Sequence, residues 1–221
     1  MSPNSQSFSE LYSAYAAGRL SPPFALLVET QSALRADIAG DVAVAEEAAG
    51  AILESEQVDR LAPNAFEKAL KAIDALDDRA AEVDAARTAG EGLTELLALP
   101  EPLRTEAIDS CGRGGWQKLT KGVQRLDLGT NSALYAHLYR IEPGSAVPHH
   151  THRGNEYTLV VQGGFTDDAG SYGPGDICCQ TPSDFHQPVA DQDGVCFALA
   201  VSEGGMKFTG VLGILQKLSG R

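Results

Sequence analysis

The sequence predicts a two-domain chain, in which an N-terminal helical bundle precedes a C-terminal β-barrel. Charge divides the 221 residues: residues 1–100 hold 17 acidic and 7 basic side chains, a net charge of −10, whereas residues 101–221 carry a net charge of only −3. All five histidines and all four cysteines lie in the second part. Hydrophobic residues recur at helical spacing in the first part and alternate with period two in the second. These differences indicate two modules with different roles.

The domain boundary is expected where the composition changes. We expect a helical domain over 1–85, a linker over 86–112, a barrel domain over 113–212 and a C-terminal tail over 213–221. The linker contains the run Thr88-Ala89-Gly90-Glu91-Gly92, which is typical of a tether with at most one short helix.

Start and stop signals divide the first part into helices. It is rich in Ala, Leu and Glu, which favour helices. One helix is expected to end at Gly18, and Ser21 followed by Pro22 suits the start of a second. Gly40 and Gly50 are expected to mark later boundaries.

A further amphipathic helix is expected after Asn64. Its apolar face is formed by residues at helical spacing, namely Phe66, Leu70, Ile73 and Leu76. Such a stripe is more typical of a core-facing helix, and a partner-binding face is the alternative.

The second part alternates with period two beyond about Trp116. Residues 134–141, 157–161 and 195–201 are rich in β-branched and aromatic residues and predict strands. The turns between them contain Pro143-Gly144, Gly163-Gly164 and Pro174-Gly175-Asp176. Short strands separated by glycine turns indicate a β-sandwich or barrel.

Composition excludes several classes of function. Thirty acidic against 17 basic residues give a net charge of −13, which repels phosphate backbones and anionic lipids, so we expect no direct binding to nucleic acid or membrane. No run approaches the roughly 20 apolar residues that cross a bilayer, and the N-terminus lacks the features of a signal peptide. We therefore expect a cytoplasmic protein.

Four residues in the second part have the chemistry of a metal site. His150 and His152 share one face of an extended strand, and an irregular step brings Glu156 toward the same centre, with His186 as the expected fourth ligand. Imidazole nitrogens and a carboxylate suit Zn, Fe, Mn, Ni or Co, and the ligand types alone do not choose among these metals.

The remaining histidines and the cysteines are expected to be structural. His149 points away from His150 on alternation, and His137 is expected to pack rather than ligate. Adjacent Cys178 and Cys179 point to opposite faces, so no disulfide framework is indicated, and a redox role for the cysteines is the alternative.

The spacing around these residues resembles the cupin family. Gly144, five residues, His150-x-His152, three residues, Glu156, six residues and Gly163 match the first cupin motif without a gap. The interval from Gly175 to His186 fits the second motif, but Pro182 lies one place later than usual and Ala190 replaces the customary asparagine. The resemblance implies a jelly-roll barrel, also called a double-stranded β-helix.

Over nearly its full length the chain resembles ChrR-type anti-sigma factors. The resemblance is carried by Tyr15-Ala16-Ala17-Gly18, Leu20-Ser21 and Phe24-Ala25-Leu26 in the first part, and by Val147-Pro148, the histidine motif and Gln162-Gly163 in the barrel. It implies that the helices sequester an extracytoplasmic-function sigma factor and that the cupin domain senses an oxidant such as singlet oxygen. It also implies one divalent metal, zinc first, held by His150, His152, His186 and Glu156.

One departure from this family concerns a second zinc site. The zinc signature of the anti-sigma domain should fall on Gln6, Gln31, Arg35 and Ile38, none of which is a good zinc ligand. The helical domain must then be held together by packing, with Ile38 and Leu34 filling the vacated centre, or it has lost its sigma-binding role.

Two other classes of function are weighed against the regulator. One is a metal-dependent cupin enzyme, such as a dioxygenase, isomerase or hydrolase, with Tyr157, Gln162 and Phe165 lining its pocket. The other is a barrel that senses a small molecule or a peroxide. Pairing of two barrels through a sheet edge into a homodimer is also considered.

Overall fold

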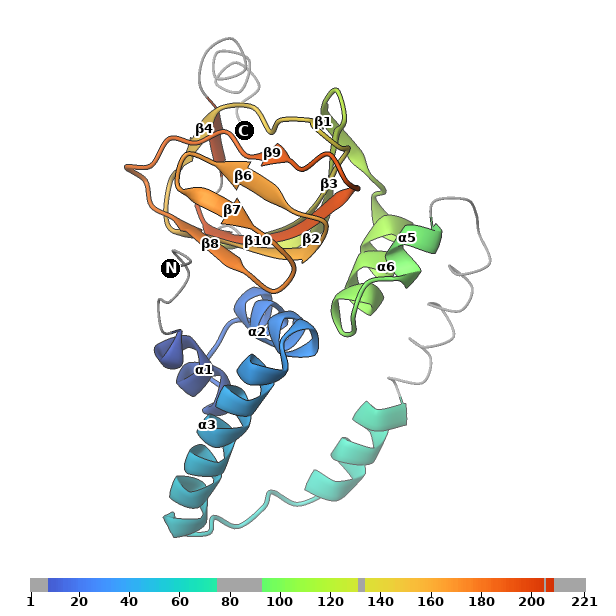
Figure 1. Ribbon diagram of the computed structural model, residues 1–221. Coiled ribbons are helices and arrows are strands. Elements are labelled where there is room, and N and C mark those ends of the chain that lie inside the picture. The colour runs from blue at the N-terminus through green and yellow to red at the C-terminus, as the bar shows by residue number, and fades with distance from the viewer. Residues whose placement is uncertain (1–7, 75–92, 131–133, 205, 209–221) are drawn as a thin grey trace.

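The computed structural model describes residues 8–74, 93–130, 134–204 and 206–208, and it shows helices followed by a β-barrel (Figure 1). The expected order of helical and β parts is therefore confirmed. The helices are α1 (Ser9–Ala16), α2 (Pro22–Leu34), α3 (Ala36–Ser55), a helix over residues 65–74, α5 (Leu93–Leu97) and α6 (Leu103–Arg113).

The barrel consists of three antiparallel sheets. The largest has the order β1-β2-β3-β10-β5-β8, and smaller sheets have the orders β7-β6-β9 and β11-β4. The strands are β1 (Gln117–Thr120), β2 (Val123–Thr130), β3 (Leu134–Ile141), β4 (His150–His152), β5 (Glu156–Gln162), β6 (Phe165–Asp167), β7 (Gly170–Tyr172), β8 (Ile177–Gln180), β9 (Val189–Ala190), β10 (Cys196–Glu203) and β11 (Met206–Phe208).

Both faces of the six-stranded sheet are buried. In β10, Phe197, Leu199 and Val201 belong to the core shared with the helices, whereas Ala198 and Ala200 belong to the core inside the barrel. Successive side chains of a strand point to opposite faces, so one strand serves both cores. This explains why residues 195–201 form a nearly continuous apolar run.

Helices α2, α5 and α6 cover the outer face of this sheet. Leu27 of α2 is fully buried in the shared core, together with side chains of α5, α6 and the segment between them, namely Leu96, Leu99, Leu103, Ala107 and Ile108. Glu95 of α5 forms a bidentate ion pair with Arg140 of β3, at 2.6 and 2.8 Å. The described part of the expected linker 86–112 is therefore not a tether, because burial of its leucines makes it part of the barrel unit.

Helices α1, α2 and α3 form a small bundle with its own core. Tyr12, Val28 and Val42 are its buried hydrophobic side chains. Gly40 and Gly50 do not end helices, since α3 runs through both, so this expectation was wrong. A helix tolerates an interior glycine at a cost of about 1 kcal/mol relative to alanine, which packing elsewhere offsets.

The helix over residues 65–74 lies apart from the barrel, beyond the end of α3 (Figure 1). Phe66 is 73% exposed and Ile73 is 56% exposed. The expectation that this stripe packs into a core is wrong for these residues, and Leu76 lies outside the described part. No helix within the described ranges is both long enough and apolar enough to cross a membrane.

Candidate metal centre

Four ligand-type side chains meet inside the barrel. His150 and His152 stand at the two ends of β4, Glu156 begins β5, and His186 lies in the loop before β9. The backbones of His150 and His186 exchange two hydrogen bonds of 3.2 Å, which fix the loop beside the strand. All four side chains belong to residues that are at most 5% exposed. The structure thus brings together all four residues that the sequence predicted as ligands.

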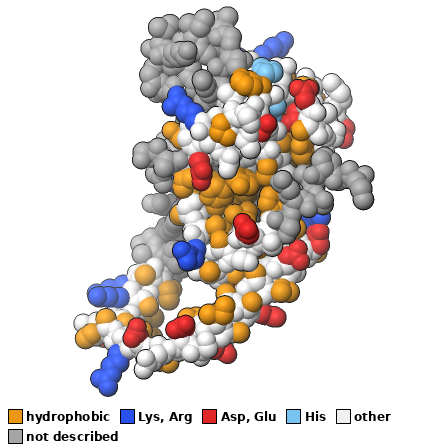
Figure 2. Space-filling view, turned by 90° about the vertical axis from the view of Figure 1, so that its left-hand side faces the viewer, with side chains coloured by type: hydrophobic (Ala, Val, Ile, Leu, Met, Phe, Trp, Pro, Cys, Tyr) orange, Lys and Arg blue, Asp and Glu red, His pale blue; other side chains and the backbone are white. Residues whose placement is uncertain are grey.

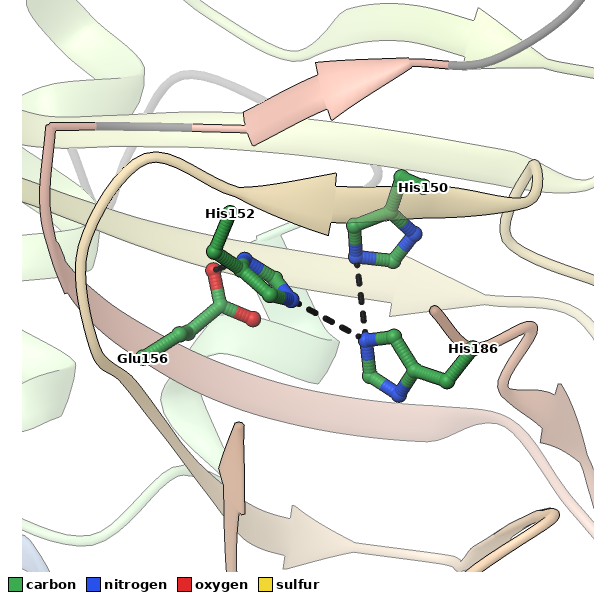
Figure 3. Close-up of side chains that lie close together, drawn as sticks. All are labelled: His150, His152, Glu156 and His186. Carbon is green, nitrogen blue, oxygen red and sulfur yellow. Dashed lines mark hydrogen bonds and ion pairs between the residues drawn. The ribbon is translucent and has the colours of Figure 1, made fainter. Parts of the chain in front are cut away.

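The ligand atoms converge on one point (Figure 3). One nitrogen or oxygen from each residue lies within 4.8 Å of those from the other three. Nε2 of His186 lies 3.2 Å from Nε2 of His150 and 3.2 Å from Nε2 of His152. Nδ1 of His152 lies 3.3 Å from Oε2 of Glu156, but this buried nitrogen has no aligned hydrogen-bond partner.

In two of the rings, the hydrogen bond made by Nδ1 determines whether Nε2, which faces the cluster, is a donor or an acceptor. Nδ1 of His150 lies 2.8 Å from the Pro148 carbonyl oxygen, and Nδ1 of His186 lies 2.9 Å from Oδ2 of Asp167. Because a carbonyl and a carboxylate only accept hydrogen bonds, both Nδ1 atoms carry the proton, and both Nε2 atoms of the neutral rings are acceptors. Two acceptors that face each other at 3.2 Å repel unless a cation lies between them.

The charges of the cluster suit a divalent cation. Burial lowers the pKa of His150 to about 4, so this ring is neutral at pH 7. Burial alone would raise the pKa of Glu156, but the three facing histidines overcome this effect and lower it, so the carboxylate is ionised. Imidazole nitrogens and a carboxylate are the ligands that Zn, Fe, Mn and Ni accept in proteins. The residues present therefore fit a bound metal.

Asp167 supports the cluster, and the sequence reasoning missed it. Its Oδ2 accepts the His186 ring proton, while its Oδ1 accepts from the backbone amides of Ala169 and Gly170 at 2.9 and 3.1 Å. Burial opposes ionisation, yet these donors lower the pKa of Asp167. A carboxylate behind a ligating histidine fixes the ring and raises its basicity. Alternation places Asp167 on the same face of β6 as Phe165, but it does not show that this face meets His186.

The cavity beside the cluster is small. It measures about 30 Å³, and its apolar wall includes Tyr139, Ile141, Phe165 and Ala198. Such a volume holds one or two water molecules. Of the residues expected to line a pocket, Phe165 lines this cavity. Tyr157 borders a separate, wider groove that also reaches Glu156, and its ring packs against Phe24 of α2, at 5.6 Å between ring centroids.

The two other predicted histidine positions and Gln162 lie outside the cluster. His137 is buried in β3 between the rings of Tyr135 and Tyr139, at 6.0 and 6.1 Å. His149 is exposed and stacks on Phe185. Gln162 is exposed at the end of β5.

Similarity to known proteins extends over both parts of the chain. Residues 106–204 match the family described as the ChrR Cupin-like domain. Over 202 residues the chain is 32% identical to the Anti-sigma-E factor ChrR of Cereibacter sphaeroides, with 91% of each chain covered. The chain belongs to the ChrR family. Its fold is also similar to the crystal structure of Rhodobacter sphaeroides SigE in complex with the anti-sigma ChrR, with a TM-score of 0.64 and 29% identity over 88% of this chain and 96% of that chain.

The departures from the second cupin motif do not disrupt the cluster of four ligand-type residues. The carbonyl of Pro182 accepts a hydrogen bond of 3.0 Å from the Thr151 hydroxyl, which ties the His186 loop to β4. Ala190, in place of the customary asparagine, is buried and pairs with Phe165 in the small sheet. Asp167 supplies the contact to His186 from a different strand.

Three of the four positions of the missing family zinc signature are described. Gln31 is buried, accepts a hydrogen bond from the Tyr12 hydroxyl at 3.0 Å and donates one to the Gly175 carbonyl at 3.0 Å. Arg35 forms ion pairs with acidic neighbours, and Ile38 packs against the small bundle core. Gln6 lies outside the described residues. Leu34, also expected to fill this centre, packs instead against the core shared with the barrel.

Proposed function

We propose that this chain is an anti-sigma factor whose helical half binds an extracytoplasmic-function sigma factor. The observation that carries the proposal is the extent of its similarity to ChrR, which covers 91% of both chains and therefore includes the helices. A match to the barrel alone would say little, because one fold hosts many unrelated functions. A sigma factor acts on RNA polymerase, so we also propose a cytoplasmic location.

The surface of the helical half supports this proposal. Large hydrophobic side chains are exposed along α3, the following segment and helix 65–74, namely Val44, Ile52, Leu53, Val58, Leu61, Phe66, Leu70 and Ile73. Exposed apolar patches mark interaction sites, and we propose that these side chains contact the partner. In the lower part of the molecule, where these helices lie, hydrophobic side chains are interspersed with acidic and basic ones (Figure 2).

Charge gives this surface its selectivity. The first 100 residues carry a net charge of −10. Opposite charge speeds encounter and selects among partners. An acidic surface with apolar anchors suits the basic helices with which a sigma factor contacts DNA and polymerase.

We further propose that the barrel holds one zinc ion and receives the stress signal, an oxidant such as singlet oxygen. His150, His152, Glu156 and His186 would hold the ion. In structural zinc sites the ion ties separate segments of the chain together. Here it would join β4, the start of β5 and the loop before β9. Iron, manganese and nickel are the alternative metals.

A metal-dependent enzyme is the competing function. The cavity of about 30 Å³ beside the histidines is too small for an organic substrate, so an enzyme would have to bind its substrate in the wider groove of about 750 Å³ that borders Glu156 and Tyr157.

The test is affinity capture from a lysate of the source cell, with the immobilised full-length protein as bait and mass spectrometry of the retained proteins. We expect an extracytoplasmic-function sigma factor to be retained by the wild type and lost with Phe66→Glu, which places a charge in the exposed apolar face. Ala72→Glu adds the same charge on another side of this helix and should retain the sigma factor. Absence of any sigma factor from the wild-type capture would contradict the proposal.

A further inference from the structure

The bundle of helices α1–α3 meets the barrel through α2. Its apolar contact consists of Leu27, which is fully buried in the core of the sheet, and Phe24, whose ring packs edge-on against Tyr157. At the C-terminal end of α2 the contact becomes polar and reaches the turn between β7 and β8, residues 173–176.

Gln31 is the centre of this polar contact. It is 4% exposed, and both ends of its side-chain amide are satisfied. Its oxygen accepts from the Tyr12 hydroxyl of α1, and its nitrogen donates to the Gly175 carbonyl, each at 3.0 Å. One buried amide thus links α1, α2 and the barrel turn. A buried polar group that loses its partners costs free energy, so this contact is specific as well as stabilising.

Arg35 makes a second contact to the same turn. Its guanidinium pairs with Asp37 of α3 at 2.6 Å and with Asp176 at 3.5 Å. Gly175 leaves room for it, because a Cβ at this position would lie 2.4 Å from Cγ and 2.8 Å from Cδ of Arg35. Gly175 also has a φ of +88°, which side chains rarely adopt.

The turn is held rigidly on the barrel side. The Gly175 amide donates to the Val160 carbonyl of β5 at 2.8 Å, and the Gly173 amide donates to Oδ2 of Asp176 at 3.0 Å. The position of the Gly175 carbonyl and the Asp176 carboxylate is therefore set by contacts within the barrel as well as by the helices.

The core that α1, α2 and α3 share among themselves is small. Its buried hydrophobic side chains are Tyr12, Val28 and Val42, and six partly buried hydrophobic side chains pack around them. So small a core gives little stability of its own. Tyr12 is also the residue that Gln31 connects to the barrel.

We propose that the turn over residues 173–176 is an intramolecular docking site that holds α1–α3 in their folded arrangement through Gln31 and Arg35. The helical half is then ordered by the barrel, and release of the turn loosens the helices while the barrel stays folded. Any effect of this release on partner binding rests on the anti-sigma function proposed above. The docking itself does not, and the experiment below contains no sigma factor, so the two proposals can fail separately.

The experiment is hydrogen–deuterium exchange, read by mass spectrometry, on the full-length protein. Two variants break the contact: Gln31→Leu removes both hydrogen bonds at similar volume, and Gly175→Ala inserts a Cβ against Arg35. Gly129→Ala is the matched control, because Gly129 also has a positive φ, of +112°, but a Cβ added there would meet no atom within 4 Å. We expect exchange in α1–α3 to rise at least tenfold in both variants and to stay unchanged in β3, β5 and β10.

A milder variant keeps the test decisive if the first two fold poorly. Asp176→Asn removes the charge that pairs with Arg35 and keeps an oxygen for the Gly173 amide, so a smaller rise confined to α1–α3 is expected. Unchanged exchange in α1–α3 for all three variants would overturn the proposal. An equal rise in helices and barrel would also overturn it, because the contact would then serve overall stability alone.

Discussion

Lowering the pH from 7 to 5 is expected to destabilise the metal-free protein by about 4 kcal/mol, through two buried histidines. Burial lowers the pKa of His137 and of His150 from 6.5 to about 4. Between pH 6.5 and about 4 the unfolded chain therefore binds protons at these positions, while most folded molecules do not. Each histidine contributes about 2 kcal/mol of this loss at pH 5.

The histidines and the carboxylates affect the free energy of unfolding in different pH ranges. The pKa values of Glu156 and Asp167 are lowered in the folded protein, so their contribution is present above their ordinary pKa and is lost only as the pH falls through the lowered values. The ordinary values are 4.5 and 3.8. Between pH 7 and 5 the two histidines dominate.

The assay is urea denaturation of the metal-free protein at pH 7, 6 and 5, followed by the fluorescence of Trp116, which packs near Phe197. In His137→Phe the decrease in the free energy of unfolding between pH 7 and 5 should be only about 2 kcal/mol, because one of the two histidines is removed. His149→Gln, at an exposed position, should leave the loss unchanged. Stability that is flat from pH 7 to 5, or an unaltered loss in His137→Phe, would refute the reasoning.

Three further perturbations test the cores and the metal centre. Leu27→Ala should lower the free energy of unfolding by about 3 kcal/mol, because it leaves a cavity at a fully buried position. The control Leu53→Ala, at a position that is 74% exposed, should change it by less than about 0.5 kcal/mol. Chemical denaturation measures both changes. Asp167→Asn should weaken zinc affinity about 10- to 100-fold in a competition titration, with exposed Asp168→Asn as the unchanged control. Zinc at about 100 times its dissociation constant should raise the free energy of unfolding by about 2.7 kcal/mol. A midpoint temperature of thermal unfolding that changes neither with added zinc nor with added chelator would contradict the site.

The four-residue cluster could be predicted because its signal is local. His150, His152 and Glu156 lie within seven residues, and strand alternation places two of them on one face. Asp167 could not be assigned in the same way, because only the pairing of β6 with β9 and the position of the His186 loop bring it to the cluster. That information is long-range and has no signature in the spacing.

The wrong expectations about the helices have one cause: they depend on tertiary contacts, which local sequence patterns do not show. Residues 93–113 follow a glycine-containing run that is typical of a tether, but their leucines are apolar enough to bury against the sheet. In α3, tertiary contacts and neighbouring helix formers outweigh the cost of Gly40 and Gly50. The stripe of helix 65–74 has the pattern of a core and yet is exposed, since amphipathicity shows that a face needs a partner but not which partner.

The most direct test of the central claim is a run-off transcription assay with RNA polymerase core enzyme, the captured extracytoplasmic-function sigma factor and a promoter that it recognises. Addition of the full-length protein should reduce the transcript in proportion to its concentration and abolish it near one molecule per sigma factor, while Phe66→Glu should inhibit at least tenfold less well. Undiminished transcription at a large excess of the wild-type protein would contradict the claim that this chain is an anti-sigma factor.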